Sequence, residues 1–134
     1  MGNFIKKGSI LIVDDEQVVL DVVTLMVKKL GYEVLQARNG REATQIFSKN
    51  NEAICLAILD MKLPDESGSD ICKRLKHINH TVKVLHTSGI GADIESETLE
   101  CDCDFCLPKP FKFEELSRTL KELLDENEGE SRNA

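Results

Sequence analysis

Short apolar runs alternate with amphipathic segments along most of this 134-residue chain. Five β-strands are predicted by the apolar runs at residues 9–13, 32–37, 54–59, 82–87 and 103–107. Five helices are predicted by apolar residues at helical spacing, near residues 16–30, 40–49, 69–77 and 91–101 and from residue 113 onward. Because strands and helices alternate, the expected fold is an α/β domain whose parallel sheet is covered by helices on both faces.

The same pattern sets the expected limits of the domain. Residues 54–59 are apolar at every position, which indicates a central strand covered on both faces. Asn39 is suited to cap the helix that begins after it. The sequence has no internal repeat and no interdomain linker, and no DNA-binding or enzymatic output domain is expected within it. One domain is expected over residues 9–124, between an N-terminal extension (1–8) and a polar tail (125–134).

Polar side chains gather where the predicted strands end. Asp60 closes the buried third strand, and a charge in that position is rarely there for packing. Functional residues of parallel α/β folds lie at the carboxyl ends of the strands, so residues in this position are expected to meet at one edge of the sheet. The others are Asp14 and Asp15 after the first strand, Thr87 and Ser88 at the end of the fourth, and Lys109 after the fifth.

The chemistry of this edge follows from its charges. Asp14, Asp15 and Asp60 would repel one another, so the site requires a cation. Oxygen ligands favour a hard ion, and few protein ligands with several waters suit Mg²⁺, for which Mn²⁺ can substitute. A carboxylate beside a metal ion and Lys109 is suited to attack a phosphoryl group. The expected product is an acyl phosphate on Asp60, with a hydroxyl at the end of the fourth strand holding one phosphoryl oxygen.

Composition excludes several other classes of function. The net charge of −7 argues against binding to nucleic acid or to an anionic membrane surface. No apolar run approaches the roughly 20 residues of a membrane span, and the N-terminus lacks the apolar core of a signal peptide. We therefore expect a cytoplasmic protein without membrane or direct nucleic-acid partners.

The cysteines and histidines are expected to be structural. Five cysteines form no disulfide framework, and the spacing of Cys101, Cys103 and Cys106 lacks a fourth metal ligand. Reduced thiols that pack as small hydrophobic side chains are expected, with regulatory oxidation as the alternative. His77 and His80 are expected to be solvated after the third helix, and His86 to lie in a strand.

Two other classes fit the same fold less well. A phosphatase of the haloacid-dehalogenase type would also use an aspartyl nucleophile, but it usually needs a second aspartate two residues later, where this chain has Lys62. A flavin-binding protein of the flavodoxin type would have a loop rich in Ser, Thr and Gly after the first strand. This chain has two aspartates and a glutamate there.

Over nearly its whole length the sequence resembles the receiver domains of two-component response regulators. The motifs behind this resemblance are ILIVDDE at residues 10–16, LDMKLPDESG at residues 59–68, Ser88-Gly89, and PKPF at residues 108–111. The resemblance implies a doubly wound, flavodoxin-like sheet with strand order 2-1-3-4-5 and five helices. It also implies a phosphoacceptor regulator rather than an enzyme, at most phosphorylating and dephosphorylating itself. The phosphoryl group would come from a histidine kinase or a phosphotransfer protein, and the domain could stand by itself or belong to a larger hybrid kinase or regulator.

The resemblance also implies roles for individual residues. Asp60 would accept the phosphoryl group, and Lys109 would contact it, with a cis peptide between Lys109 and Pro110. Asp15 and Asp60 would bind Mg²⁺ directly and Asp14 mainly through water, and the backbone carbonyl of Lys62 would be a further ligand.

The family pattern also identifies a switch hydroxyl at the end of the fourth strand. A hydroxyl residue followed by a small residue favours Ser88 over the adjacent Thr87, as does the spacing from Asp60. Family members often have an aromatic residue three positions before the lysine, where this chain has Cys106, with Phe105 one step earlier. Because a one-residue slip in a strand reverses the face, either a local irregularity shifts Phe105 or the aromatic switch is absent.

Overall fold

The computed structural model describes residues 8–89 and 103–125. The strands in this part of the chain are β1 (Ser9–Val13), β2 (Glu33–Ala37), β3 (Ile54–Asp60), β4 (Lys83–Ser88) and β5 (Phe105–Pro108). The helices are α1 (Gln17–Lys29), α2 (Gly40–Asn50), α3 (Gly68–Ile78) and α5 (Phe113–Leu120), and α5 continues into a π-helical turn at Lys121–Asp125. The helix predicted at residues 91–101 lies outside the described residues.

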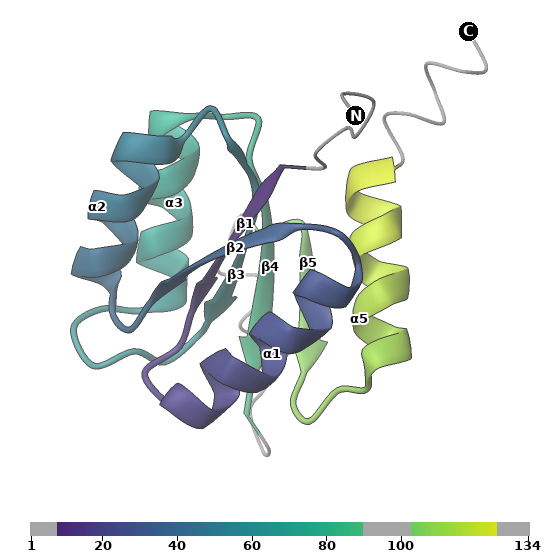
Figure 1. Cartoon of the computed structure of the whole chain (residues 1–134). Helices are drawn as coiled ribbons and strands as arrows, with labels where there is room; N and C mark the ends of the chain where they lie inside the picture. The colour runs from purple at the N-terminus through teal and green to yellow at the C-terminus, as the bar shows by residue number, and fades with distance from the viewer. Residues whose placement is uncertain (1–7, 90–102, 126–134) are drawn as a thin grey trace, which may run out of the picture.

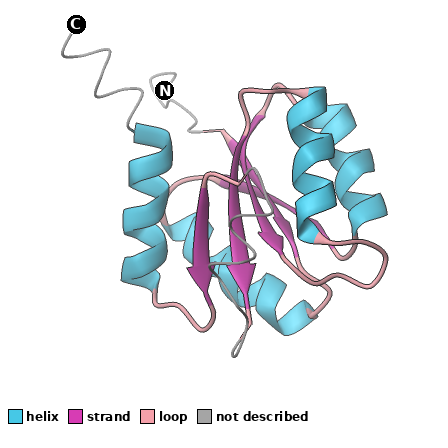
Figure 2. Cartoon of the chain, turned by 180° about the vertical axis from the view of Figure 1, so that it is seen from behind, coloured by secondary structure: helices cyan, strands magenta, loops and turns pink. Residues whose placement is uncertain are grey.

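The five strands form one parallel sheet in the order β2-β1-β3-β4-β5, which confirms the predicted topology. Helices α2 and α3 cover one face of the sheet, and α1 and α5 cover the other (Figure 1). All strands point the same way, and their arrowheads meet at the lower edge of the molecule in Figure 2. That edge therefore holds the residues that follow or close each strand.

The core has two layers, one on each side of the sheet. Alternate residues of β3 contribute to both, because Leu56 and Ile58 pack toward α1 and α5 whereas Ala57 and Leu59 pack toward α2 and α3. Residues 56–59 are at most 3% exposed, as expected for a central strand. The charge of Asp60 thus stands directly at the end of a buried central strand.

Local signals in the sequence set several element boundaries. Gly31 follows the end of α1 with φ of +99°, a conformation that favours glycine and stops a helix. The side chain of Asn39 accepts a hydrogen bond from the Glu42 N–H at 2.8 Å and caps α2, as predicted. Helix α3 extends to Ile78, so His77 is exposed within its last turn and not after it. Strand β5 begins at Phe105, two residues later than predicted, because Asp104 hydrogen-bonds to β4 through its side chain.

Candidate functional site

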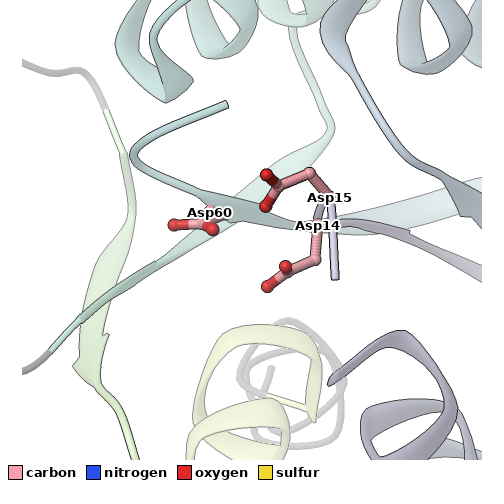
Figure 3. A group of neighbouring side chains, drawn as sticks. All are labelled: Asp14, Asp15 and Asp60. Carbon is pink, nitrogen blue, oxygen red and sulfur yellow. The ribbon is translucent and has the colours of Figure 1, made fainter. Parts of the chain in front are cut away.

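Three carboxylates converge at the carboxyl edge of the sheet. Asp14 and Asp15 follow β1, and Asp60 is the last residue of the neighbouring strand β3. One carboxylate oxygen from each lies within 4.8 Å of the others (Figure 3). Asp14 is 2% exposed and Asp15 is exposed, so the cluster reaches from the interior to the surface. The parallel register of β1 and β3 brings together residues that are 45 or more positions apart in the chain.

Lys109 supplies the positive charge of the cluster. Its ammonium donates to Asp14 Oδ2 at 2.8 Å and to Asp60 Oδ2 at 3.4 Å. The Lys109 N–H donates to the carbonyl of Ser88 at 2.7 Å, and the Lys109–Pro110 peptide is cis. These features direct the lysine side chain from the end of β5 across β4 to the carboxylates.

Burial and neighbouring charges act in opposite directions on the carboxyl of Asp60. Its pKa is raised above the ordinary value, mainly because burial disfavours the charged form and also because Asp14 is a neighbouring anion. The charge of Lys109 and the Lys62 N–H oppose this rise. Burial works against the charge of Lys109 as well, but its hydrogen bond to Asp14 and the charge of Asp60 outweigh burial and raise the pKa of the ammonium. Lys109 is therefore a permanent cation at neutral pH.

The loop after β3 folds back against Asp60. The Lys62 N–H donates to Asp60 Oδ1 at 3.3 Å, and Lys62 forms an isolated antiparallel bridge with Ser67. Gly68 begins α3 so close to β3 that a Cβ there would lie 2.6 Å from the Asp60 carbonyl oxygen. A glycine is therefore required at this position, because only a residue without a side chain allows the loop to pack this closely against the site.

The two hydroxyls at the end of β4 point to different partners. Thr87 is paired with Asp60 in the register, and its hydroxyl donates to the carbonyl of Leu59 at 3.5 Å. Ser88, also buried, places its hydroxyl 3.9 Å from the thiol of Cys106. Ser88 is the last residue of β4 and Gly89 follows it, with open space where a Cβ would stand.

Cys106 occupies the position where family members often have an aromatic residue. The β4–β5 register is regular, with Leu85 opposite Phe105 and His86 opposite Cys106. The explanation that a local irregularity shifts Phe105 is therefore wrong. Phe105 is 39% exposed, and the side chain next to Ser88 is a thiol.

The donors at this edge fit a hard divalent cation. Asp14, Asp15 and Asp60 offer oxygen ligands with a combined charge that one lysine does not neutralise. Burial, and to a smaller extent the neighbouring charge of Asp14, raises the pKa of Asp60, and a bound cation would favour its charged form. Asp15 is exposed, so an ion held here keeps water ligands, which suits Mg²⁺.

Helix α1 carries an apolar surface that the sequence analysis did not identify. Val18, Val22 and Leu25 are 75%, 46% and 66% exposed and recur at helical spacing along one side of the helix. The opposite side, with Leu20, Val23 and Val27, is buried against the sheet. The sequence held a signal for this surface, because apolar residues cover far more of α1 than one core-facing stripe requires.

The other cysteines and histidines match the structural expectation where they are described. Cys72 is buried, Cys55 and Cys103 are partly buried, and Cys101 lies outside the described residues. His80 is exposed and His86 is a buried strand residue. Among the residues that the structure describes, no helix is long and apolar enough to cross a membrane.

Comparison with known proteins agrees with this arrangement. The family model for the response regulator receiver domain matches residues 10–121. The chain belongs to this family. It is 34% identical over 116 residues to sporulation initiation phosphotransferase F of Bacillus subtilis, covering 86% of this chain and 92% of that protein.

Other relatives extend the comparison. A probable transcriptional regulatory protein of Picosynechococcus is 33% identical over 124 residues, which cover 88% of this chain and 49% of that protein. The crystal structure of a receiver domain protein from Clostridium thermocellum has a TM-score of 0.81 and 29% identity, covering 90% of this chain and 97% of that one. The chain spans about half the length of several curated transcriptional regulators that it matches, and 13% of a sensor kinase of Brucella abortus.

The role that these relatives support is that of a phosphoacceptor signalling domain in a two-component system. Its relatives include both regulators and sensor kinases, and the phosphatase reading is not favoured. Receiver domains act as signalling regulators.

Proposed function

We propose that Asp60 accepts a phosphoryl group in a Mg²⁺-dependent reaction and that the resulting charge switches a binding surface. The observation that supports this most directly is the cluster itself, in which Asp60 stands at the end of β3 within reach of both Asp14 and Lys109. Replacement of Asp60 by asparagine is the decisive experiment, because it removes the proposed acceptor oxygen and keeps the shape of the side chain.

In the proposed reaction, a carboxylate oxygen of Asp60 attacks the phosphorus atom of a phosphohistidine. The new bond is an acyl phosphate C–O–P linkage, and the phosphorus–nitrogen bond breaks. The electron pair of that bond stays on the imidazole nitrogen, which takes a proton from solvent. Lys109 neutralises one phosphoryl oxygen. Because its ammonium already lies 3.4 Å from Asp60 Oδ2, the lysine side chain needs to move little to reach a phosphoryl group on Asp60.

Asp14, Asp15 and Asp60, with the backbone carbonyl of Lys62, would hold Mg²⁺. When bound, the ion supplies charge neutralisation for a phosphoryl oxygen. The Lys62 N–H already orients Asp60 through Oδ1, which leaves Oδ2 on the side of Lys109. Mn²⁺ offers the same preference for oxygen ligands and would substitute.

The proposed activity consists only of phosphorylation and dephosphorylation of the domain's own Asp60. It would take phosphoryl groups from a protein donor or a small phosphodonor and lose them by hydrolysis of its own acyl phosphate. A domain of this kind serves equally as a separate regulator or as part of a hybrid kinase, and relatives of both types are known.

Ser88 is expected to be the hydroxyl that responds to phosphorylation, although Thr87 is the neighbour that pairs with Asp60. Ser88→Ala should allow Asp60 to be phosphorylated but should remove most of the amide shift changes that beryllofluoride causes around residues 86–89 in NMR spectra. Thr87→Ala removes a hydroxyl bound to the Leu59 carbonyl and should cost stability while retaining those changes. The opposite result for the two variants would assign the switch to Thr87.

The phosphodonor is proposed to be a histidine kinase or a phosphotransfer protein that docks on the apolar side of α1, formed by Val18, Val22 and Leu25. This surface begins one turn after the Asp14–Asp15 pair, so a protein that presents phosphohistidine to Asp60 would also cover it. Exposed apolar side chains at such a contact are typical of protein interfaces.

Leu25→Asp is expected to slow phosphotransfer from a phosphorylated protein donor at least tenfold, because a charge would be buried at the contact. The rate with acetyl phosphate, which needs no docking surface, should stay within twofold of the wild type. Lys28→Gln is the matched control, since it makes the same change in charge at an exposed α1 residue outside the apolar surface. Equal slowing by both variants, or slowing with acetyl phosphate, would contradict docking through α1.

A further inference from the structure

The loop between β3 and α3 is attached to the start of helix α2 by one side chain. Both oxygens of Asp65 accept hydrogen bonds from successive backbone N–H groups of α2, Oδ1 from Gly40 at 2.9 Å and Oδ2 from Arg41 at 3.0 Å. Asn39 caps the same helix through the Glu42 N–H. The bonds from Gly40 and Arg41 hold the pKa of Asp65 below its ordinary value, so it stays charged at neutral pH.

A second attachment lies next to the first. Glu66 forms a two-pronged ion pair with Arg74 of α3, at 2.9 Å and 2.6 Å, and Arg74 also donates to the Thr44 hydroxyl of α2 at 3.0 Å. The Glu66 side chain occupies the place where a Cβ on Gly40 would stand. The absence of a side chain at Gly40 thus allows the loop to lie directly on α2.

The same loop shapes the phosphoacceptor site. Lys62, three residues before Asp65, orients Asp60 through its N–H and is bridged to Ser67. The Gly68 N–H donates to the Met61 carbonyl at 2.9 Å and closes the base of the loop. Closure at the base fixes the two ends of the loop, and Asp65 and Glu66 attach the part between them to its neighbours. Asp65 is exposed and lies outside the cluster of Asp14, Asp15 and Asp60, so neither packing nor the proposed chemistry requires a carboxylate there.

We propose that Asp65 is a positioning residue, which fixes the 61–67 loop to the N-terminus of α2 so that the carbonyl of Lys62 and the carboxylate of Asp60 face the same metal ion. This inference rests on the proposed function, because it concerns the metal that we assign to that site. Outer residues that orient metal ligands in this way commonly change metal affinity by about an order of magnitude.

The test is to titrate Mg²⁺ into metal-free protein by calorimetry, with Mn²⁺ binding by electron paramagnetic resonance as a second probe. Asp65→Ala is expected to weaken Mg²⁺ binding roughly tenfold. Asn39→Ala is the matched control, because it removes a cap from the same helix and the bond that it deletes runs to Glu42 of that helix. It should lower Tm in the same way but leave the Mg²⁺ affinity within twofold.

Hydrogen exchange in the metal-free protein distinguishes a positioning role of Asp65 from a general loss of stability. In metal-free Asp65→Ala, hydrogen exchange at the Gly68 amide should speed up more than at core amides of β1, whereas Asn39→Ala should show no such difference. Should Asp65→Ala fail to fold, Asp65→Asn keeps the shape and one acceptor oxygen, and it should show a smaller loss of affinity in the same direction.

The outcomes distinguish this inference from the proposed function. Unchanged Mg²⁺ affinity in the Asp65 variants, together with wild-type exchange at Gly68, overturns the positioning role and leaves phosphorylation of Asp60 intact. Equal loss of affinity in Asn39→Ala also overturns it, because helix stability would then explain the effect. A wild-type protein that binds no Mg²⁺ and takes up no phosphoryl group overturns both.

Discussion

Asp60→Asn is expected to reduce phosphoryl incorporation to background, with either acetyl phosphate or a phosphorylated kinase as donor. The amide keeps the shape of the side chain but lacks the anionic oxygen that would attack phosphorus. Incorporation is measured by the mobility shift of phosphorylated protein on a phosphate-binding gel. Asp21→Asn in α1 is the control for the acetyl phosphate reaction, since it removes an exposed carboxylate outside the site and should leave labelling by that small donor unchanged. Full labelling of Asp60→Asn would place the phosphoryl group on another residue.

The same substitution is expected to stabilise the metal-free protein. The folded protein raises the pKa of Asp60, so ionisation of this carboxyl costs stability once the pH rises through that raised value. An amide does not ionise, so the variant should have a Tm higher by about 2–5 °C at pH 7. The difference should shrink as the pH falls and the wild-type carboxyl takes up its proton. A lower Tm at pH 7 would show that the Lys109 contact outweighs burial and repulsion.

The strands and the edge that holds the candidate site could be predicted from the sequence because each depends on local pattern. The apolar run at residues 54–59 marks a central strand by itself, and Asp60 interrupts that run where the strand ends. Once parallel strands are inferred, Asp14 and Lys109 must lie at the same edge, although 95 residues separate them. The short range of the signals explains why the strands and helices that the structure describes begin and end within two residues of their predicted limits.

Features that depend on distant contacts could not be predicted. The bonds from Gly40 and Arg41 to Asp65 join residues 24 and 25 positions apart, and no periodicity marks them. The side chain next to Ser88 depends on the exact register of β4 and β5. The sequence did not determine whether that side chain is Phe105 or Cys106. The exposed side of α1 was visible as an excess of apolar residues, but only burial shows which of them face outward.

Lys109 and a divalent cation would neutralise the same carboxylates, so the loss of one should increase the effect of the other. The Lys109 side chain is 19% exposed, and the side chains of its partners Asp14 and Asp60 are 3% and 13% exposed. Removing one partner of such a buried group leaves uncompensated charge behind. Lys109→Ala is therefore expected to lower the free energy of unfolding by about 2–4 kcal/mol at pH 7 without metal.

Lys76→Ala provides the matched control, because Lys76 forms an ion pair of similar length with Asp104, at 2.9 Å, away from the cluster. That partly exposed pair should contribute about 1 kcal/mol or less. Urea unfolding with and without Mg²⁺ then measures the coupling: Mg²⁺ should stabilise Lys109→Ala more than the wild type, and should stabilise Lys76→Ala as it does the wild type. If Mg²⁺ stabilises both variants equally, the ion and Lys109 act on different groups, and the carboxylates at the ends of β1 and β3 are not its binding site.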